Sequence, residues 1–234
     1  SINFDTSSTR NMSHMFENCL SLTSLDLSKF ATENVIDFSY MFNQCTALQR
    51  LTINSFNTSS AVSMAYMFGY CFKLSFVNLK KFNTEKVKDM SYMFWYNAEV
   101  IRFDLSSFST PNLLNFSHAF EGCSNLNSII FGNLITSKVV DMSYLFIDCY
   151  TMTSIDLSKF DTSRVTNMAE MISGCSNLKS LDLSKFNTSN VINMQRMFKN
   201  CRELTSLDIS DFKTSYCSNM QGMFSQLEKI TSNR

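Results

Sequence analysis

The chain has 234 residues, with 20 basic and 20 acidic side chains, five Gly and one Pro. Because the charges balance, no bulk field favours nucleic acid or an anionic membrane as a partner. No apolar run approaches the roughly 20 residues of a membrane helix, so we expect no membrane insertion by this segment.

A repeat of 26 residues runs through the whole sequence. Counted from Phe4, it restarts without insertion at Phe30, Phe56, Phe82, Phe108, Leu134, Phe160, Phe186 and Phe212. Self-similarity at a fixed period of this length is typical of solenoid proteins. The sequence therefore predicts one repeat domain over residues 1–234, with eight full repeats and a truncated ninth.

The first part of each repeat predicts a short helix. In the first repeat Met12, Met15, Phe16 and Cys19 follow the spacing i, i+3, i+4, i+7 of one helix face. Just before this face stands Asn11, whose side-chain oxygen is expected to accept a hydrogen bond from the first helical N–H groups. The equivalent predicted N-caps are Asp37, Asp89, Asn115, Asp141, Asn167, Asn193 and Asn219.

The end of each repeat predicts a very short strand. Apolar and polar residues alternate at Leu25-Asp26-Leu27, Phe103-Asp104-Leu105, Leu181-Asp182-Leu183 and Leu207-Asp208-Ile209, so the middle side chain should face outward. Stacked repeats would cover one another's apolar faces and join these strands in a parallel sheet with right-handed connections. The predicted fold is an α/β, curved right-handed leucine-rich-repeat solenoid, with the sheet on the concave side and short helices on the convex side.

The segment Leu22-x-x-Leu25-x-Leu27-x-x-Phe30 matches the leucine-rich-repeat signature, with Phe in the last place. With the Met-x-x-Met-Phe-x-x-Cys part before it, the unit resembles the BspA-like surface-protein repeats, in the variant common in mycoplasma lipoproteins. The resemblance implies a cell-surface or secreted protein, often an adhesin, without catalytic residues. It also implies a membrane anchor, but we expect neither an anchor nor a signal segment within this chain.

Seven cysteines share one position of the repeat, namely Cys19, Cys45, Cys71, Cys123, Cys149, Cys175 and Cys201. Neighbouring helices would lie roughly 8–10 Å apart, which is too far for a disulfide or for tetrahedral zinc. We therefore expect buried free thiols and no metal site. Cys217, at a position usually held by Val, is also expected in the core.

Two polar columns have structural and functional interpretations. A Thr recurs at Thr6, Thr32, Thr58, Thr84, Thr110, Thr136, Thr162, Thr188 and Thr214, which invites an ice-binding interpretation but favours a role in tying backbone groups of the connecting loops. An outward-facing Asp recurs at Asp26, Asp104, Asp156, Asp182 and Asp208. Each Asp lacks the second ligand of a calcium loop, so a solvated polar face is favoured over a weak cation site.

Aromatic residues interrupt positions that are small or polar in most repeats. Tyr70, Phe72, Trp95 and Tyr96 do so in the third and fourth repeats, and Phe76 replaces a Ser between Arg50 and Arg102 of the adjacent repeats. Exposed aromatics beside arginines are typical of a protein-binding or glycan-binding surface. The alternative is that some of these rings fold inward where Asn97 replaces the usual Cys. The candidate ligand-binding residues are Tyr70, Phe72, Phe76, Trp95, Tyr96, Arg50 and Arg102.

Catalysis has no support in the sequence. His14 and His118 lie four repeats apart and cannot form a base–nucleophile pair, and no Gly-rich phosphate loop is present. We expect no enzyme activity and no cofactor. The predicted function is a recognition or adhesion module for a host protein or glycan. The alternative is a structural subunit of a surface layer or filament, assembled by end-to-end self-association of the solenoid.

Overall fold

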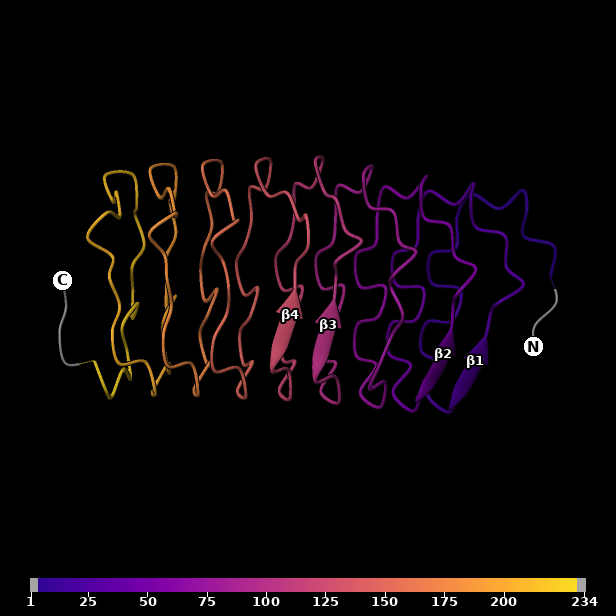
Figure 1. Cartoon of the computed structure of the whole chain (residues 1–234), viewed down its shortest axis with the longest axis horizontal. Coiled ribbons are helices and arrows are strands. Elements are labelled where there is room, and N and C mark those ends of the chain that lie inside the picture. Colours follow the sequence, from indigo (N-terminus) through magenta and orange to yellow (C-terminus); the bar gives the residue numbers. More distant parts are fainter. Residues whose placement is uncertain (1–3, 231–234) are drawn as a thin grey trace.

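The computed structural model describes residues 4–230, which form a row of stacked rungs (Figure 1). A rung is one 26-residue repeat, the first beginning at Phe4. One residue of each rung forms a parallel β-bridge with its equivalent in the next rung, from the pair Asn11–Asp37 to the pair Asn193–Asn219. Bridged backbones lie about 4.8 Å apart, so β-type spacing holds the solenoid together along its length.

Regular strands are few and short. β1 (Ser24–Asp26) pairs in parallel with β2 (Arg50–Thr52), and β3 (Arg102–Asp104) pairs in parallel with β4 (Ser128–Ile130). The predicted alternation is confirmed in β1, where Leu25 is buried and Asp26 is exposed. The predicted sheet, however, is present among residues 4–230 only as these two separate pairs.

The outward-facing Asp residues turn the chain directly after the strand position in five of the rungs. The Asp26 carboxylate accepts a hydrogen bond from the N–H of Ser28 at 2.9 Å, which turns the chain immediately after the strand. The same bond follows Asp104, Asp156, Asp182 and Asp208. The Ser28 hydrogen bonds hold the pKa of Asp26 below its usual value. The Asp column is therefore a set of turn-forming residues.

The predicted convex helices are wrong, because residues 4–230 contain no helix. In the second rung the N–H of Met41 donates a hydrogen bond within the rung, to the carbonyl of Phe38 at 3.2 Å. The N–H of Tyr40 instead donates to the next rung, to the carbonyl of Ala65 at 2.9 Å. These two kinds of bond alternate along the segment. We call this segment, residues 38–46 and its equivalents in the other rungs, the turn run.

Backbone angles exclude a helix from the turn run. Tyr40 and Gln44 have φ values of 58° and 60°, whereas every residue of an α-helix has negative φ. The second of these positions is held by Gly122 and Gly174 in two later rungs, and glycine adopts positive φ without strain. The predicted cap bond does form, since Asp37 accepts from the N–H of Ser39 at 2.8 Å, but it begins a turn.

The predicted burial pattern of this segment is nevertheless confirmed. Phe38, Met41, Phe42 and Cys45 are fully buried at the spacing i, i+3, i+4, i+7. The predicted curvature depended on a helical edge wider than the strand edge, and that edge is absent. Figure 1 accordingly shows the rungs in a nearly straight row.

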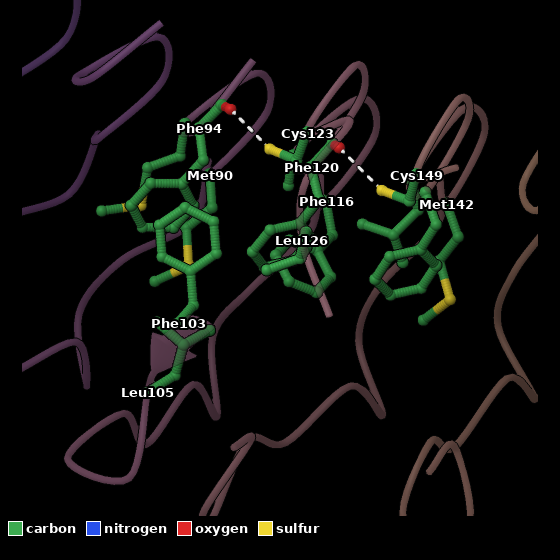
Figure 2. Packing of buried hydrophobic residues seen from close by; sticks show 14 of the residues in the cluster. Met90, Phe94, Phe103, Leu105, Phe116, Phe120, Cys123, Leu126, Met142 and Cys149 are labelled. Atoms are coloured by element: carbon green, nitrogen blue, oxygen red, sulfur yellow. Dashed lines mark hydrogen bonds between the residues drawn. The ribbon is translucent and has the colours of Figure 1, made fainter. Parts of the chain in front are cut away.

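The cysteine column lies in the core as free thiols, as predicted. The Cys123 thiol donates to the carbonyl of Phe94 and the Cys149 thiol to that of Phe120 (Figure 2), at 3.1 and 3.3 Å. We expected helices roughly 8–10 Å apart to keep the cysteines too far from one another for a disulfide. That expectation is wrong, because rungs about 4.8 Å apart are within reach of a disulfide. Each thiol instead points to a carbonyl of the preceding rung. Cys19 and Cys217 are only half-buried.

The threonine column ties neighbouring rungs together, which confirms the structural interpretation. The Thr110 hydroxyl donates to the carbonyl of Ile135 at 2.7 Å and accepts from the N–H of the same residue at 2.9 Å. The same pair of bonds is made by Thr6, Thr32, Thr58, Thr84, Thr136, Thr162 and Thr188. These side chains are buried, so they cannot meet an ice surface.

Candidate functional site

One outward-facing position of the turn run carries a ladder of stacked rings. Successive ring centroids along this position lie 4.0–4.6 Å apart, with interplanar angles of 7–10°. Offset stacking at this distance stabilises aromatic pairs. The residues that carry these rings all have positive φ, a backbone conformation that is unfavourable for bulky side chains. The ring ladder consists of His14, Tyr40, Tyr66, Tyr92, His118 and Tyr144.

The structure brings four of the predicted site residues together beside this ladder. The Tyr70 ring lies 4.3 Å from Phe72, 4.9 Å from Trp95 and 5.5 Å from Tyr96, measured between centroids. All four side chains are partly exposed. We call Tyr70, Phe72, Trp95 and Tyr96 the aromatic patch. The edges of the patch continue into the ring ladder, because Trp95 meets Tyr92 edge-on at 6.0 Å.

The replacement of Cys by Asn97 does not disturb the packing beneath the patch. Asn97 is 1% exposed, and its side-chain amide donates to the carbonyl of Phe68 at 2.8 Å, as the thiols do in other rungs. The alternative that rings fold inward to fill a defect at Asn97 therefore loses its basis. Two polar atoms nearby, Nε1 of Trp95 and Oδ1 of Asn97, are buried without a hydrogen-bond partner.

The other three predicted site residues lie apart from the patch, at the position where the strands begin. Arg50 is the first residue of β2 and Arg102 the first residue of β3, and both are exposed. Phe76 has the equivalent position in the rung between them and is 66% exposed. Within residues 4–230, no ring contact joins Phe76 to the patch. We call Arg50, Phe76 and Arg102 the strand row.

Glu121 provides a carboxylate next to the patch, in the following rung. The N–H of Tyr96 donates to the backbone carbonyl of Glu121 at 2.7 Å, and the Glu121 side chain, 17% exposed, contacts Nδ1 of His118. Burial raises the pKa of the Tyr96 hydroxyl, and the charge of Glu121 raises it further. Burial and the charge of Glu170 raise the pKa of Tyr144 in the ring ladder, and the charge of Glu121 raises it further. The negative field of Glu121 thus reaches the rings around it.

Asp148 is a second carboxylate on this surface, one rung beyond Glu121. Burial raises its pKa, and the nearby charges of Glu121 and Glu170 raise it further, against the effects of a hydrogen bond from the Tyr150 hydroxyl and of the charge of Lys199. The side chain lies over Gly174, where an added Cβ would come within 2.1 Å of the carboxylate oxygen. The absence of a side chain at Gly174 therefore leaves room for this carboxylate.

Sequence analysis missed the ring ladder and the two carboxylates. The signal for the ladder was present in the recurrence of Tyr or His every 26 residues, but a helical model separates successive rings by the spacing of packed helices. Glu121 and Asp148 had no distinguishing motif, because their importance comes from neighbours in adjacent rungs.

Among residues 4–230, no group of three His, Cys, Asp or Glu side chains is arranged to hold a metal ion. In the same residues, no helix has the length and apolar character needed to cross a membrane.

Comparisons with known proteins give a family and a fold. Two overlapping stretches, residues 11–132 and 115–234, match the family described as "Mycoplasma protein of unknown function, DUF285". A leucine-rich repeat protein from Eubacterium ventriosum ATCC 27560 has a similar solved structure, with a TM-score of 0.53 and 17% sequence identity. The match covers 90% of this chain and 63% of that chain, so this chain spans less than two thirds of that protein. No curated protein matches the chain.

The two matches agree with the repeat pattern. The family match extends over nearly all of the rungs, and the structural match is to a leucine-rich repeat fold. The resemblance to BspA-like repeats is therefore confirmed. This chain belongs to the mycoplasma family DUF285 and is a leucine-rich-repeat protein of the BspA-like type.

Proposed function

We propose that this chain is a non-enzymatic recognition module at the cell surface or in secreted form, and that it binds a host protein or glycan through the aromatic patch. One observation carries the proposal. Tyr70, Phe72, Trp95 and Tyr96 stand where other rungs have small or polar residues, and their rings contact one another at a partly exposed surface. Clustered Tyr and Trp side chains are the residues that most often dominate binding energy at interfaces.

The scaffold supports this use of the patch. Each rung is tied to the next by the Thr bonds, and most pairs of rungs are also joined by thiol–carbonyl bonds or by the equivalent bond of Asn97. The patch rings therefore lie on a backbone with many fixed contacts. Rigid aromatic side chains lose little conformational entropy on binding. The strand row of Arg50, Phe76 and Arg102 is a second candidate contact for the same or another partner.

The test compares the wild type with a patch variant on arrays of extracellular proteins and glycans. The patch variant carries Tyr70→Asn, Phe72→Ser, Trp95→Ser and Tyr96→Asn, which restore residues typical of the other rungs. The matched control is Tyr216→Asn, because Tyr216 is 73% exposed at a position held by Asn in other rungs. We expect a ligand that binds the wild type and the control but not the patch variant. A ligand retained by the patch variant contradicts the proposal.

The second candidate function is end-to-end assembly. It is favoured by Met220 and Phe224 of the ninth rung, which are 46% and 48% exposed although their equivalents in inner rungs are buried. These side chains would stack on any further rung, whether of the same chain or of another copy. Light-scattering mass against concentration distinguishes the two functions, since assembly predicts rod growth and the recognition module predicts a constant mass.

A further inference from the structure

The turn runs present a surface whose charge is of one sign over most of the solenoid. The runs of the third to sixth rungs, residues 64–72, 90–98, 116–124 and 142–150, contain no Lys or Arg, and their only acidic residues are Glu121 and Asp148. Beside the patch, Lys73 forms an ion pair with Glu99 at 3.1 Å, which leaves no net charge there. The aromatic surface is therefore acidic.

Neither carboxylate forms an ion pair with a Lys or Arg among the described residues. Glu121 contacts a His118 ring nitrogen and Asp148 is bonded by the Tyr150 hydroxyl. Glu170, in the seventh rung, instead has a guanidinium partner, because Arg196 lies 3.4 Å from its carboxylate. Glu121 and Asp148 are thus the carboxylates of these four turn runs that form no direct ion pair with Lys or Arg among the described residues, and the charge of Lys199 acts on Asp148 without such a contact.

We propose that the aromatic patch recognises a peptide segment rich in arginine, with guanidinium groups that stack on the patch rings and pair with Glu121 and Asp148. This inference rests on the proposed function and names the chemistry of the partner. Guanidinium groups bind both to aromatic faces and to carboxylates. Charge complementarity of this kind provides specificity and raises the association rate.

The extent of the surface favours a peptide over a small cation. Four rungs at about 4.8 Å spacing extend over about 14 Å between the first and the last, which is the length of four to five residues of an extended chain. The patch rings also contact one another at 4.3–5.5 Å, so they form a continuous surface instead of an enclosed cage for one ammonium group.

Trp95 is the only tryptophan of the chain, so its fluorescence reports binding at the patch. The probe is a hexaarginine peptide titrated into the wild-type protein, with hexaglutamate and choline as comparison ligands. The test variant carries Glu121→Gln and Asp148→Asn, which remove both charges while keeping the side-chain size. The matched control is Glu203→Gln, a partly exposed carboxylate of the eighth rung paired with Lys229. Equal thermal unfolding temperatures establish that both variants are folded.

We expect hexaarginine to change Trp95 fluorescence saturably in the wild type and the control, and to bind the test variant at least about tenfold more weakly. Equal affinity for the test variant, no response to hexaarginine, or an equal response to hexaglutamate overturns the inference. Carboxylate-dependent binding of choline with no preference for hexaarginine also overturns it, in favour of a small quaternary cation.

The patch variant separates this inference from the proposed function. Because the patch variant lacks Trp95, its binding of hexaarginine is measured by titration calorimetry, alongside the wild type and the test variant. If hexaarginine binding is lost in the patch variant but kept in the test variant, the patch binds ligands and the charge argument is wrong. If the arrays give a ligand that depends on the patch rings but not on the two carboxylates, the proposed function stands and the arginine-rich partner is excluded.

Discussion

The Tyr96 ring packs directly against Gly122 of the next rung, where an added Cβ would lie 2.8 Å from the ring carbons. Gly122 also has a φ of 69°, which a side chain makes unfavourable. The shape of the aromatic patch therefore depends on a glycine in the adjacent rung as well as on the aromatic residues themselves.

Gly122→Ala should destabilise the protein and move the Tyr96 ring. We expect a loss of roughly 2–4 kcal/mol in the free energy of unfolding, from positive φ at a residue with a Cβ and from overpacking. Urea unfolding followed by circular dichroism measures it, and a shifted emission of Trp95, whose ring lies 5.1 Å from Tyr96, reports the movement. In a Tyr96→Asn background the cost should fall by about 1–3 kcal/mol. If Gly122→Ala lowers the free energy of unfolding equally in the Tyr96→Asn background, contact with the Tyr96 ring does not cause the loss.

Thr110→Val tests the hydroxyl bonds between rungs. Valine has the same shape, but it leaves the N–H and carbonyl of Ile135 without the partners they have at 2.9 and 2.7 Å. Because Thr110 is buried, we expect a loss of about 2–4 kcal/mol in urea unfolding. The control Thr214→Val, at an exposed Thr of the ninth rung, should stay within about 0.5 kcal/mol of the wild type. Similar losses in both variants would disprove the role of the bonds.

Asn97→Cys should stabilise the fold slightly, by about 1 kcal/mol. A thiol can still donate to the carbonyl of Phe68, as in the other rungs, and the unpartnered Oδ1 of Asn97 is removed. Asn97→Ala should instead cost about 1–3 kcal/mol, because that carbonyl loses its donor. Chemical denaturation of both variants checks the order of stability, and a Cys variant less stable than the Ala variant would contradict it.

The buried thiols predict a loss of stability in alkali. Burial raises the pKa of Cys123 from 9.0 to about 12, so between these pH values the unfolded chain has lost a proton that the folded protein keeps. The free energy of unfolding should therefore be unaffected below pH 9 and fall above it, by about 1.4 kcal/mol per pH unit for each such thiol. Burial also raises the pKa of Cys45 and Cys201 to about 12.

Urea unfolding between pH 8 and 11 measures this dependence. In Cys123→Ala the decline should be shallower than in the wild type by about 1.4 kcal/mol per pH unit. The control Cys217→Ala, which changes a half-buried thiol, should follow the wild type. A decline of the same slope in all three proteins would contradict the assignment to Cys123.

The repeat and the buried positions could be predicted from the sequence, but the backbone of the turn run could not. Phe38, Met41 and Cys45 have the spacing of a helix face, and a series of four-residue turns buries the same positions. Only the Gly at 122 and 174 indicated positive φ there, because the equivalent Tyr70 and Tyr96 adopt it against their usual preference. Hydrogen bonds to the next rung outweigh that preference.

The candidate site was predictable in part, for a similar reason. Tyr70, Phe72, Trp95 and Tyr96 stood out because they depart from the repeat, and the structure brings them together. Phe76 also departs from it, but its position is at the strand, away from the patch. Glu121 follows no unusual pattern in its own rung. Only the register between rungs, in which the Tyr96 N–H donates to the Glu121 carbonyl, brings the charge of its carboxylate near the Tyr96 hydroxyl.

The most direct test of the recognition surface is hydrogen–deuterium exchange of the chain with and without the ligand selected on the arrays. The account predicts slower exchange in residues 66–72 and 92–98, with smaller changes around Glu121, and no change in residues 180–184 of the seventh rung. Slower exchange confined to the first and ninth rungs, or to the strand row, would contradict the assignment of binding to the aromatic patch.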